Sequence, residues 1–139
     1  MQISKDIAAI SRYLRRKRHR YMEPLGLKSL HARLLLDILE TPGLSQDSLS
    51  QKAGFDKSNI ARQVAVLEEA GYVRRAPSSM DKRVLELYPT EKTLLLQPEL
   101  LRAMEQWEEK LVANLTGEEK QLLAALLGKL RAAAMEDEG

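Results

Sequence analysis

The segment spanning residues 44–88 constrains the fold of this 139-residue chain more than any other part. Ser45 stands where a helix N-cap is expected, and the short helix that it opens should end at Gly54, because glycine readily adopts the left-handed conformation of helix ends. Asp56 offers a second N-cap and opens a longer helix that should end near Gly71. A short capped helix, a tight turn and a second helix together predict a helix–turn–helix.

The apolar pattern changes from helical to extended after Gly71. Residues 72–75 are predicted to form a short strand, residues 77–79 a turn, and residues 84–88 a returning strand of apolar and β-branched character. The result is a β-hairpin with a polar, charged tip directly after the second helix. Such a hairpin makes the predicted motif a winged helix–turn–helix.

Helices are also predicted on both sides of the winged segment. Apolar residues spaced three and four apart predict helices over about residues 4–21, 30–40 and 90–114. Pro98 should kink or interrupt the last of these, because proline has no backbone N–H and clashes with the preceding turn. A Thr-Gly-Glu-Glu capping box at residues 116–119 opens a final helix. The expected fold class is mainly α with a small β-hairpin wing.

The helix after Asp56 is predicted to have two faces. At about 100° per residue, the apolar side chains of Ile60, Val64 and Leu67 fall together and should pack on neighbouring helices. A separate polar face suits DNA, since Asn and Gln pair with adenine edges, Arg pairs with guanine, and the first turn suits phosphates. The alternative is that these residues only solvate a surface helix. The predicted contacts to double-stranded DNA from this motif are Ser45, Lys57, Ser58, Asn59, Arg62 and Gln63.

The predicted hairpin carries a second set of candidate DNA contacts. Arg74 and Arg75 lie at its base, and Asp81, Lys82 and Arg83 lie just past its tip. A carboxylate two residues before an arginine can hold the guanidinium in one orientation. An oriented arginine on a hairpin tip can enter a minor groove, where narrow A·T-rich stretches concentrate negative potential. The alternative is a local surface ion pair that contributes little stability.

Charge is distributed unevenly along the chain, although the formal net charge is only +2. Residues 1–89 carry 16 Lys and Arg against 10 Asp and Glu, whereas residues 90–139 carry 6 against 10. A basic segment joined to an acidic one suggests a polyanion as the partner of the first. The alternative interpretation is ordinary scatter of charge.

Composition and motifs exclude several classes of protein. The absence of cysteine excludes disulfides, Fe–S clusters, thiolate metal sites and cysteine nucleophiles. His19 and His31 fall on different predicted helices, so we expect both to be partly exposed and expect no metal site. Without a Gly-rich phosphate loop or a G-x-S-x-G elbow, we expect neither an enzyme nor a cofactor. No stretch reaches about 20 apolar residues, and the N-terminus reverses the order of a secretory signal, so a cytoplasmic protein without a membrane partner is expected.

The leucine stripes of the terminal helices predict a homodimer. A small winged domain cannot cover both faces of two long helices, so a second copy of the chain is the simplest cover. The stripe of the last predicted helix and the apolar face of the first are the main candidates. The predicted interface residues are Ile3, Ile7, Ile10, Leu14, Trp107, Leu111, Leu115, Leu122, Leu126 and Leu130.

Residues 15–20, Arg-Arg-Lys-Arg-His-Arg, form a basic run on the first predicted helix. A run of this length wraps around the helix, so its side chains cannot all face DNA. Two interpretations remain open for it. It is either a solvated helix end or a partner in salt bridges to the acidic last helices of a second subunit, or else it contacts phosphates or binds an anionic ligand.

Five short segments together resemble the MarR family of transcription factors, and the likeness covers nearly the whole chain. The first is Glu-Pro-Leu-Gly-Leu at residues 23–27, and the others lie within the winged segment. The sequence departs from the family after the wing, where the usual Leu-Thr-x-x-Gly is replaced by Tyr-Pro-Thr-Glu-Lys-Thr at residues 88–93, so the junction there is expected to differ. The segments within the winged region are residues 44–53, 56–62, 67–73 and 81–83.

The resemblance implies a single chain over residues 1–139 that forms a homodimer. Residues 28–89 would form the winged helix–turn–helix, and residues 1–27 and 90–139 would form the dimerisation helices. Such proteins usually repress nearby genes and release DNA when a small phenolic or anionic effector binds. The expected function is sequence-specific binding to a near-palindromic operator. A winged-helix protein-interaction module without DNA binding is the alternative.

Overall fold

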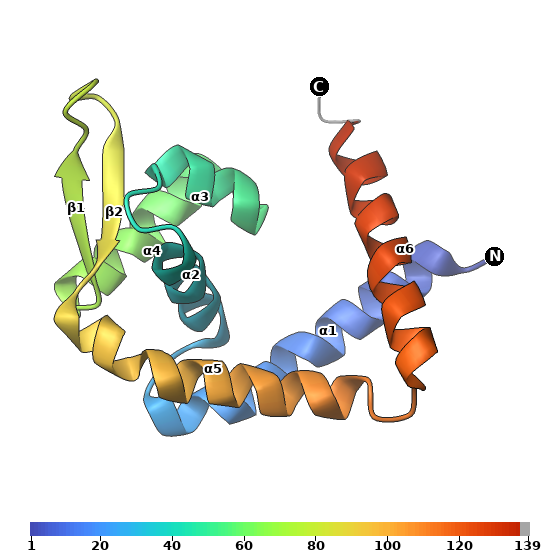
Figure 1. Ribbon diagram of the computed structural model, residues 1–139. Coiled ribbons are helices and arrows are strands. Elements are labelled where there is room, and N and C mark those ends of the chain that lie inside the picture. The colour runs from blue at the N-terminus through green and yellow to red at the C-terminus, as the bar shows by residue number, and fades with distance from the viewer. Residues whose placement is uncertain (137–139) are drawn as a thin grey trace. The chain divides into compact units, whose positions relative to one another are not determined.

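The computed structural model describes residues 1–136 and divides into two compact units, residues 1–104 and 105–139. Figure 1 shows the helices and the single hairpin in chain order. Most of the winged segment was placed correctly by the sequence analysis, with boundaries shifted by one or two residues. The elements are α1 Ile3–Met22, η1 Glu23–Leu25, α2 Ser29–Glu40, α3 Gln46–Ala53, α4 Lys57–Glu69, β1 Val73–Pro77, β2 Leu85–Pro89, α5 Glu91–Leu111 and α6 Gly117–Glu136.

The core of the first unit lies where α2, α3, α4 and β2 meet. Every one of these elements contributes a fully buried apolar side chain to it, and α2 contributes most. The predicted apolar face of α4 is confirmed, since Ile60, Val64 and Leu67 are all buried. Burial of this face fixes how α4 rotates about its axis, and its opposite face is left to solvent. The fully buried core residues of these four elements include Leu34, Leu35, Ile38, Leu49, Ile60, Val64 and Leu87.

The predicted helix caps are confirmed. The Ser45 hydroxyl accepts a hydrogen bond from the Ser48 N–H at 3.0 Å, and the Asp56 carboxylate accepts one from the Asn59 N–H at 2.7 Å. Between the two helices, Gly54 has a φ of +75°, the left-handed conformation that favours glycine. These three residues set the tight turn of the helix–turn–helix. Each side-chain cap satisfies a backbone N–H that the helix itself leaves unpaired.

The hairpin is antiparallel, and its strand residues pair from Val73 with Pro89 to Pro77 with Leu85. Pro77 therefore lies in a strand and not in the predicted turn, which starts one residue later. The hairpin is also joined to the start of α3: the Gly43 N–H donates to the Leu87 carbonyl at 2.7 Å. The Leu87 N–H donates in turn to the Leu44 carbonyl at 2.9 Å. The wing is thus hydrogen-bonded to the segment that leads into α3.

The junction after the wing is built by threonine hydroxyls. Thr90 donates to the Gly71 carbonyl at 2.5 Å, and the buried Thr93 donates to the Tyr72 carbonyl at 2.6 Å. Pro98 was expected to kink or interrupt the helix that follows, and the predicted interruption is wrong, because α5 continues through Pro98 as one helix. The missing proline N–H costs one hydrogen bond, and Pro98 lies on an exposed part of α5 where the freed carbonyl can meet water.

Each unit leaves an apolar face uncovered within the described residues. In the first unit, Ile3, Ile7 and Ile10 of α1 are about half exposed. In the second unit, α6 has no buried residue, and all five leucines of its predicted stripe are exposed. Trp107 differs from the other predicted interface residues: it is only 5% exposed within the chain itself, so its indole offers little surface to a partner.

The second unit contains the predicted capping box at the start of α6. The Glu119 N–H donates to the Thr116 hydroxyl at 3.2 Å, and the Glu119 carboxylate accepts from the Thr116 N–H at 2.8 Å. Two backbone donors are satisfied reciprocally, as the sequence predicts. Within residues 1–136, no helix has both the length and the apolar character needed to span a bilayer.

Candidate nucleic-acid interface

The outward face of α4 carries one exposed arginine. Arg62 is exposed, and Ser58 and Val66 are exposed on the same side of the helix. Because the buried face of α4 is fixed by the core, Arg62 is held pointing away from the interior. Its guanidinium presents a planar set of donors that matches the O6 and N7 acceptors of guanine.

Gln63, predicted to lie free beside Arg62, is instead half-buried and bonded to α2. Its amide Oε1 lies 2.8 Å from Nε2 of His31, and its Nε2 donates to Oδ1 of Asn59 at 3.4 Å. An amide oxygen only accepts, so His31 is the donor through Nε2–H. These two hydrogen bonds fix the orientation of the Gln63 and Asn59 amides. Nδ2 of Asn59 remains to donate outward, since no hydrogen bond occupies it in the described part of the chain.

His31 is the residue of this interface that the sequence analysis missed. We expected a partly exposed side chain, but the structure buries it to 7% exposure on α2. A buried imidazole needs a hydrogen-bond partner, and Gln63 supplies one. Thirty-two residues separate the pair, so no spacing rule within a helix or hairpin could have predicted it. The second histidine, His19, is exposed as expected.

Lys57 in the first turn of α4 and Ser45 at the cap of α3 both contact side chains within the protein. Nζ of Lys57 lies 3.4 Å from the Asp47 carboxylate, and both side chains are largely exposed. Such a surface pair contributes little stability, so Lys57 can exchange this partner for a phosphate. The Ser45 hydroxyl, in contrast, is held in its cap and also donates to the Ser48 hydroxyl at 2.8 Å.

The wing tip has the geometry predicted for an oriented arginine. Nε and Nη2 of Arg83 donate to the two carboxylate oxygens of Asp81 at 3.1 and 3.2 Å, and the Arg83 backbone N–H donates at 3.0 Å. These hydrogen bonds lower the pKa of Asp81 below its ordinary value. The Arg83 side chain is 91% exposed, and its neighbour Lys82 is exposed as well. The pair therefore displays a charged guanidinium at a fixed angle on the outer end of the wing.

The two arginines at the hairpin base have partners within the protein. Arg75 donates through Nη2 and Nε to the Glu68 carboxylate at 3.1 and 3.3 Å, and these hydrogen bonds lower the pKa of Glu68. The Arg75 side chain is only 24% exposed. Arg74 places its guanidinium 4.5 Å from the centre of the Tyr88 ring, a cation–π contact. Arg75 thus ties the wing to the end of α4.

Metal-binding groups are not gathered at this interface or elsewhere in residues 1–136. No three His, Asp or Glu side chains in that range lie close enough together to hold an ion.

Comparison with known proteins finds similarity to a family of transcriptional regulators. A sequence model described as the MarR family matches residues 25–84. The HTH-type transcriptional regulator YybA of Bacillus subtilis (strain 168) is 31% identical over 129 residues, which make up 93% of this chain and 86% of that protein. The match therefore extends well beyond the helix–turn–helix.

Solved structures share the whole fold. A MarR protein from Peptoclostridium difficile superposes with a TM-score of 0.92 at 27% identity, over 99% of this chain and 90% of that one. A MarR family transcriptional regulator from Listeria monocytogenes, solved in complex with a 26mer DNA, gives a TM-score of 0.92 at 26% identity. That superposition covers 99% of this chain and 91% of the Listeria chain.

Proposed function

The chain belongs to the MarR family of winged-helix transcriptional regulators, and we propose that it binds its operator with α4 in the major groove and the wing in the minor groove. The observation that carries this assignment is the exposed Arg62 on the face of α4 opposite its buried side. α4 has 13 residues, which at about 1.5 Å per residue gives a helix of a length that the major groove accepts. Family membership argues against the interaction module without DNA binding.

The proposed contacts fall into two classes. Arg62 and Asn59 read base edges, while Lys57, Ser58, Lys82 and Arg83 bind phosphates or the floor of the minor groove. Gln63 acts through its contact with Asn59, and Ser45, Arg74 and Arg75 support the elements that carry these groups. The similar regulator from Listeria monocytogenes was solved in complex with a 26mer DNA, which supports a DNA duplex as the partner of this chain.

We propose a homodimer in which residues 28–89 bind DNA and residues 1–27 and 90–139 hold the two copies together. The uncovered apolar faces of α1 and α6 support this division, because exposed stripes of this kind are usually covered by a partner. Twofold symmetry would present two α4 helices to successive major grooves, about 34 Å apart, on a near-palindromic operator.

Repression, effector control and a cytoplasmic location complete the proposal. A small phenolic or anionic effector would favour a dimer geometry in which the two α4 helices no longer match the groove spacing. Release of a bound fragment during a screen of such compounds would identify it.

Selection of bound fragments from random double-stranded DNA tests the central assignment. We expect a near-palindromic consensus to emerge, and its affinity to fall steeply as salt rises, because Lys and Arg release counterions from the phosphates they neutralise. Failure to enrich any sequence, or affinity that salt leaves unchanged, would contradict DNA recognition by this chain.

Replacing Arg83 with alanine should weaken binding to all sequences by a similar factor. The wing arginine contacts the backbone or the minor groove, so its loss removes affinity more than discrimination. We expect the slope of log affinity against log salt to become shallower by about one unit for each Arg83 lost. Fluorescence anisotropy with the operator and with a scrambled duplex measures both quantities. Unchanged affinity for both duplexes would remove the wing from the interface.

Replacing His31 with leucine should reduce the preference of the protein for its operator over other sequences. The change removes the donor to Oε1 of Gln63, and Asn59 then loses its fixed orientation. One net hydrogen bond contributes about 0.5–1.5 kcal/mol, so operator affinity should fall about 2- to 10-fold. The preference for the operator over a base-substituted operator should narrow by a similar factor in anisotropy titrations.

A glutamine at position 31 provides the control, because its amide can donate to the same oxygen. His31→Gln should restore the preference that His31→Leu loses. If His31→Leu lowers only the melting temperature and leaves the preference intact, then His31 serves packing alone.

A further inference from the structure

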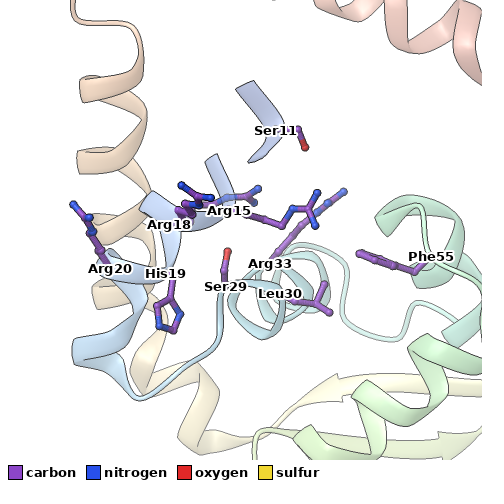
Figure 2. Close-up of a pocket in the computed structure, with 10 residues that line it drawn as sticks. Ser11, Arg15, Arg18, His19, Arg20, Ser29, Leu30, Arg33 and Phe55 are labelled. Carbon is purple, nitrogen blue, oxygen red and sulfur yellow. The ribbon is translucent and has the colours of Figure 1, made fainter. Parts of the chain in front are cut away.

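A basic cavity lies in the first unit between α1, the start of α2 and the turn that precedes α4 (Figure 2). Its volume is about 740 Å³, within the range of about 300–1,000 Å³ that small-molecule sites occupy. Four arginines of α1 and one of α2 line it, together with a histidine, and none of its lining residues is acidic. The five arginines are Arg15, Arg16, Arg18, Arg20 and Arg33.

Three of these arginines form no ion pair within the described residues. No ion pair joins Arg15, Arg16 or Arg20 to a carboxylate among the described residues. Arg33 donates a long hydrogen bond, 3.4 Å, to the carbonyl of Lys52, and its charge also acts on the Asp37 carboxylate on α2. Like charges three or four positions apart on a helix repel one another, and Arg16 and Arg20 stand at that spacing. A bound anion carrying several charges would relieve this repulsion.

The other wall of the cavity is apolar. Phe55 is 39% exposed, and in Figure 2 its ring points toward Arg33 from the side opposite α1. Leu30, a second apolar lining residue, lies below Arg33 and Phe55 in the same view. A ligand that fits both walls has a charged end and a flat apolar end, because guanidinium groups bind phosphate oxygens in pairs and an aromatic ring stacks on a flat ring.

We propose that this cavity binds a small organic molecule that carries two or more linked phosphate groups and a flat ring, the chemistry of a nucleoside polyphosphate. The phosphates lie against Arg15, Arg16 and Arg33, and the ring lies against Phe55 and Leu30. A single carboxylate would leave most of the positive charge of this wall uncompensated, which is why the charge count favours a polyphosphate.

Two other uses of these arginines fit the structure less well. A DNA duplex is too wide to enter a cavity of this size. Acidic residues of a second copy could pair with exposed arginines of α1, but they would not account for the position of Arg33, half-buried on α2 behind them. Both uses are outcomes that the experiment below separates.

Isothermal titration calorimetry of the full-length protein with ATP tests the site, without DNA or divalent metal and at fixed ionic strength. We expect saturable binding at one site per chain, weaker binding of inorganic tripolyphosphate, and none of adenosine. Arg15→Gln and Arg33→Gln should each weaken ATP binding at least 10-fold. Phe55→Ala should weaken ATP but leave tripolyphosphate unchanged.

Lys17→Gln is the matched control, since it removes one positive charge from α1 at a position outside the cavity. It should bind ATP as the unmodified chain does, and thermal melts should show that all variants remain folded. The proposal is overturned if neither ATP nor tripolyphosphate binds saturably, or if Lys17→Gln weakens binding as much as Arg15→Gln.

Gel shifts and sedimentation of the same variants separate the other uses. Loss of DNA affinity or of the dimer in Arg15→Gln, without any ATP binding by the unmodified chain, would assign the arginines to DNA or to a second copy and overturn the proposal. Because calorimetry is performed without DNA, a failure of the DNA-binding function would not affect the result.

Discussion

Replacing Arg62 with alanine is expected to lower affinity for the selected operator by about 1–3 kcal/mol, roughly 5- to 150-fold. Arg62 is the exposed arginine on the outward face of α4, and a bidentate arginine–guanine contact has this magnitude. The loss should concentrate at one base pair of each half-site. A substitution at that base pair should weaken the original protein and leave the variant almost unaffected. Anisotropy titrations against every single-base variant of the operator would measure the effect.

Two further variants distinguish base reading from simple loss of charge. Arg62→Lys keeps the charge but loses the planar pair of donors, so it should retain part of the affinity while losing most of the discrimination. Arg12→Ala removes one exposed arginine from α1 and should leave discrimination intact. If Arg62→Ala loses affinity equally for all sequences, Arg62 is a phosphate contact and the assignment of α4 to base reading fails.

Placing aspartates at Leu122 and Leu126 is expected to abolish the dimer and to lower operator affinity at least about 100-fold. Both leucines are exposed on α6, 60% and 47%, as the proposed interface requires. Charges buried in an apolar contact are strongly unfavourable. Without the link between two copies, each winged domain must bind its half-site alone, and linkage of two modules commonly contributes 10²- to 10⁴-fold.

Sedimentation equilibrium and operator titrations should change together in this double variant. The matched control places aspartates at Gln121 and Ala132, which at about 100° per residue lie on the side of α6 opposite the leucine stripe. Both positions are exposed, so this control should remain dimeric and keep its affinity. A leucine variant that stays dimeric would show that α6 does not form the interface.

Local chemistry accounts for the features that could be predicted from the sequence. A cap such as Asp56 and the wing pair of Asp81 and Arg83 depend on residues two or three positions apart, so their spacing predicts them. The two faces of α4 follow from helical periodicity alone. The turn chemistry of Gly54 and the capping box before α6 belong to the same class.

The partners that were missed depend on tertiary packing. His31 meets Gln63 because α2 and α4 pack against a common core, and Arg75 meets Glu68 because the hairpin folds back along α4. Sequence spacing does not specify which side chains meet across such contacts. In both cases a predicted DNA contact has a partner on another element of the protein. The continuous helix at Pro98 likewise depends on solvent reaching the freed carbonyl.

The bonds that fasten the hairpin have a consequence for which operators can be bound. Because Leu87 is bonded to the segment before α3 and Arg75 to the end of α4, we expect the base of the wing to keep its position relative to α4 on different duplexes. A half-site with an ill-fitting groove width must therefore bend or compress toward the protein, and sequences that deform easily gain an advantage at positions that no side chain touches. Operators that differ in the spacing between half-sites must then be accommodated by a change at the interface between the two copies.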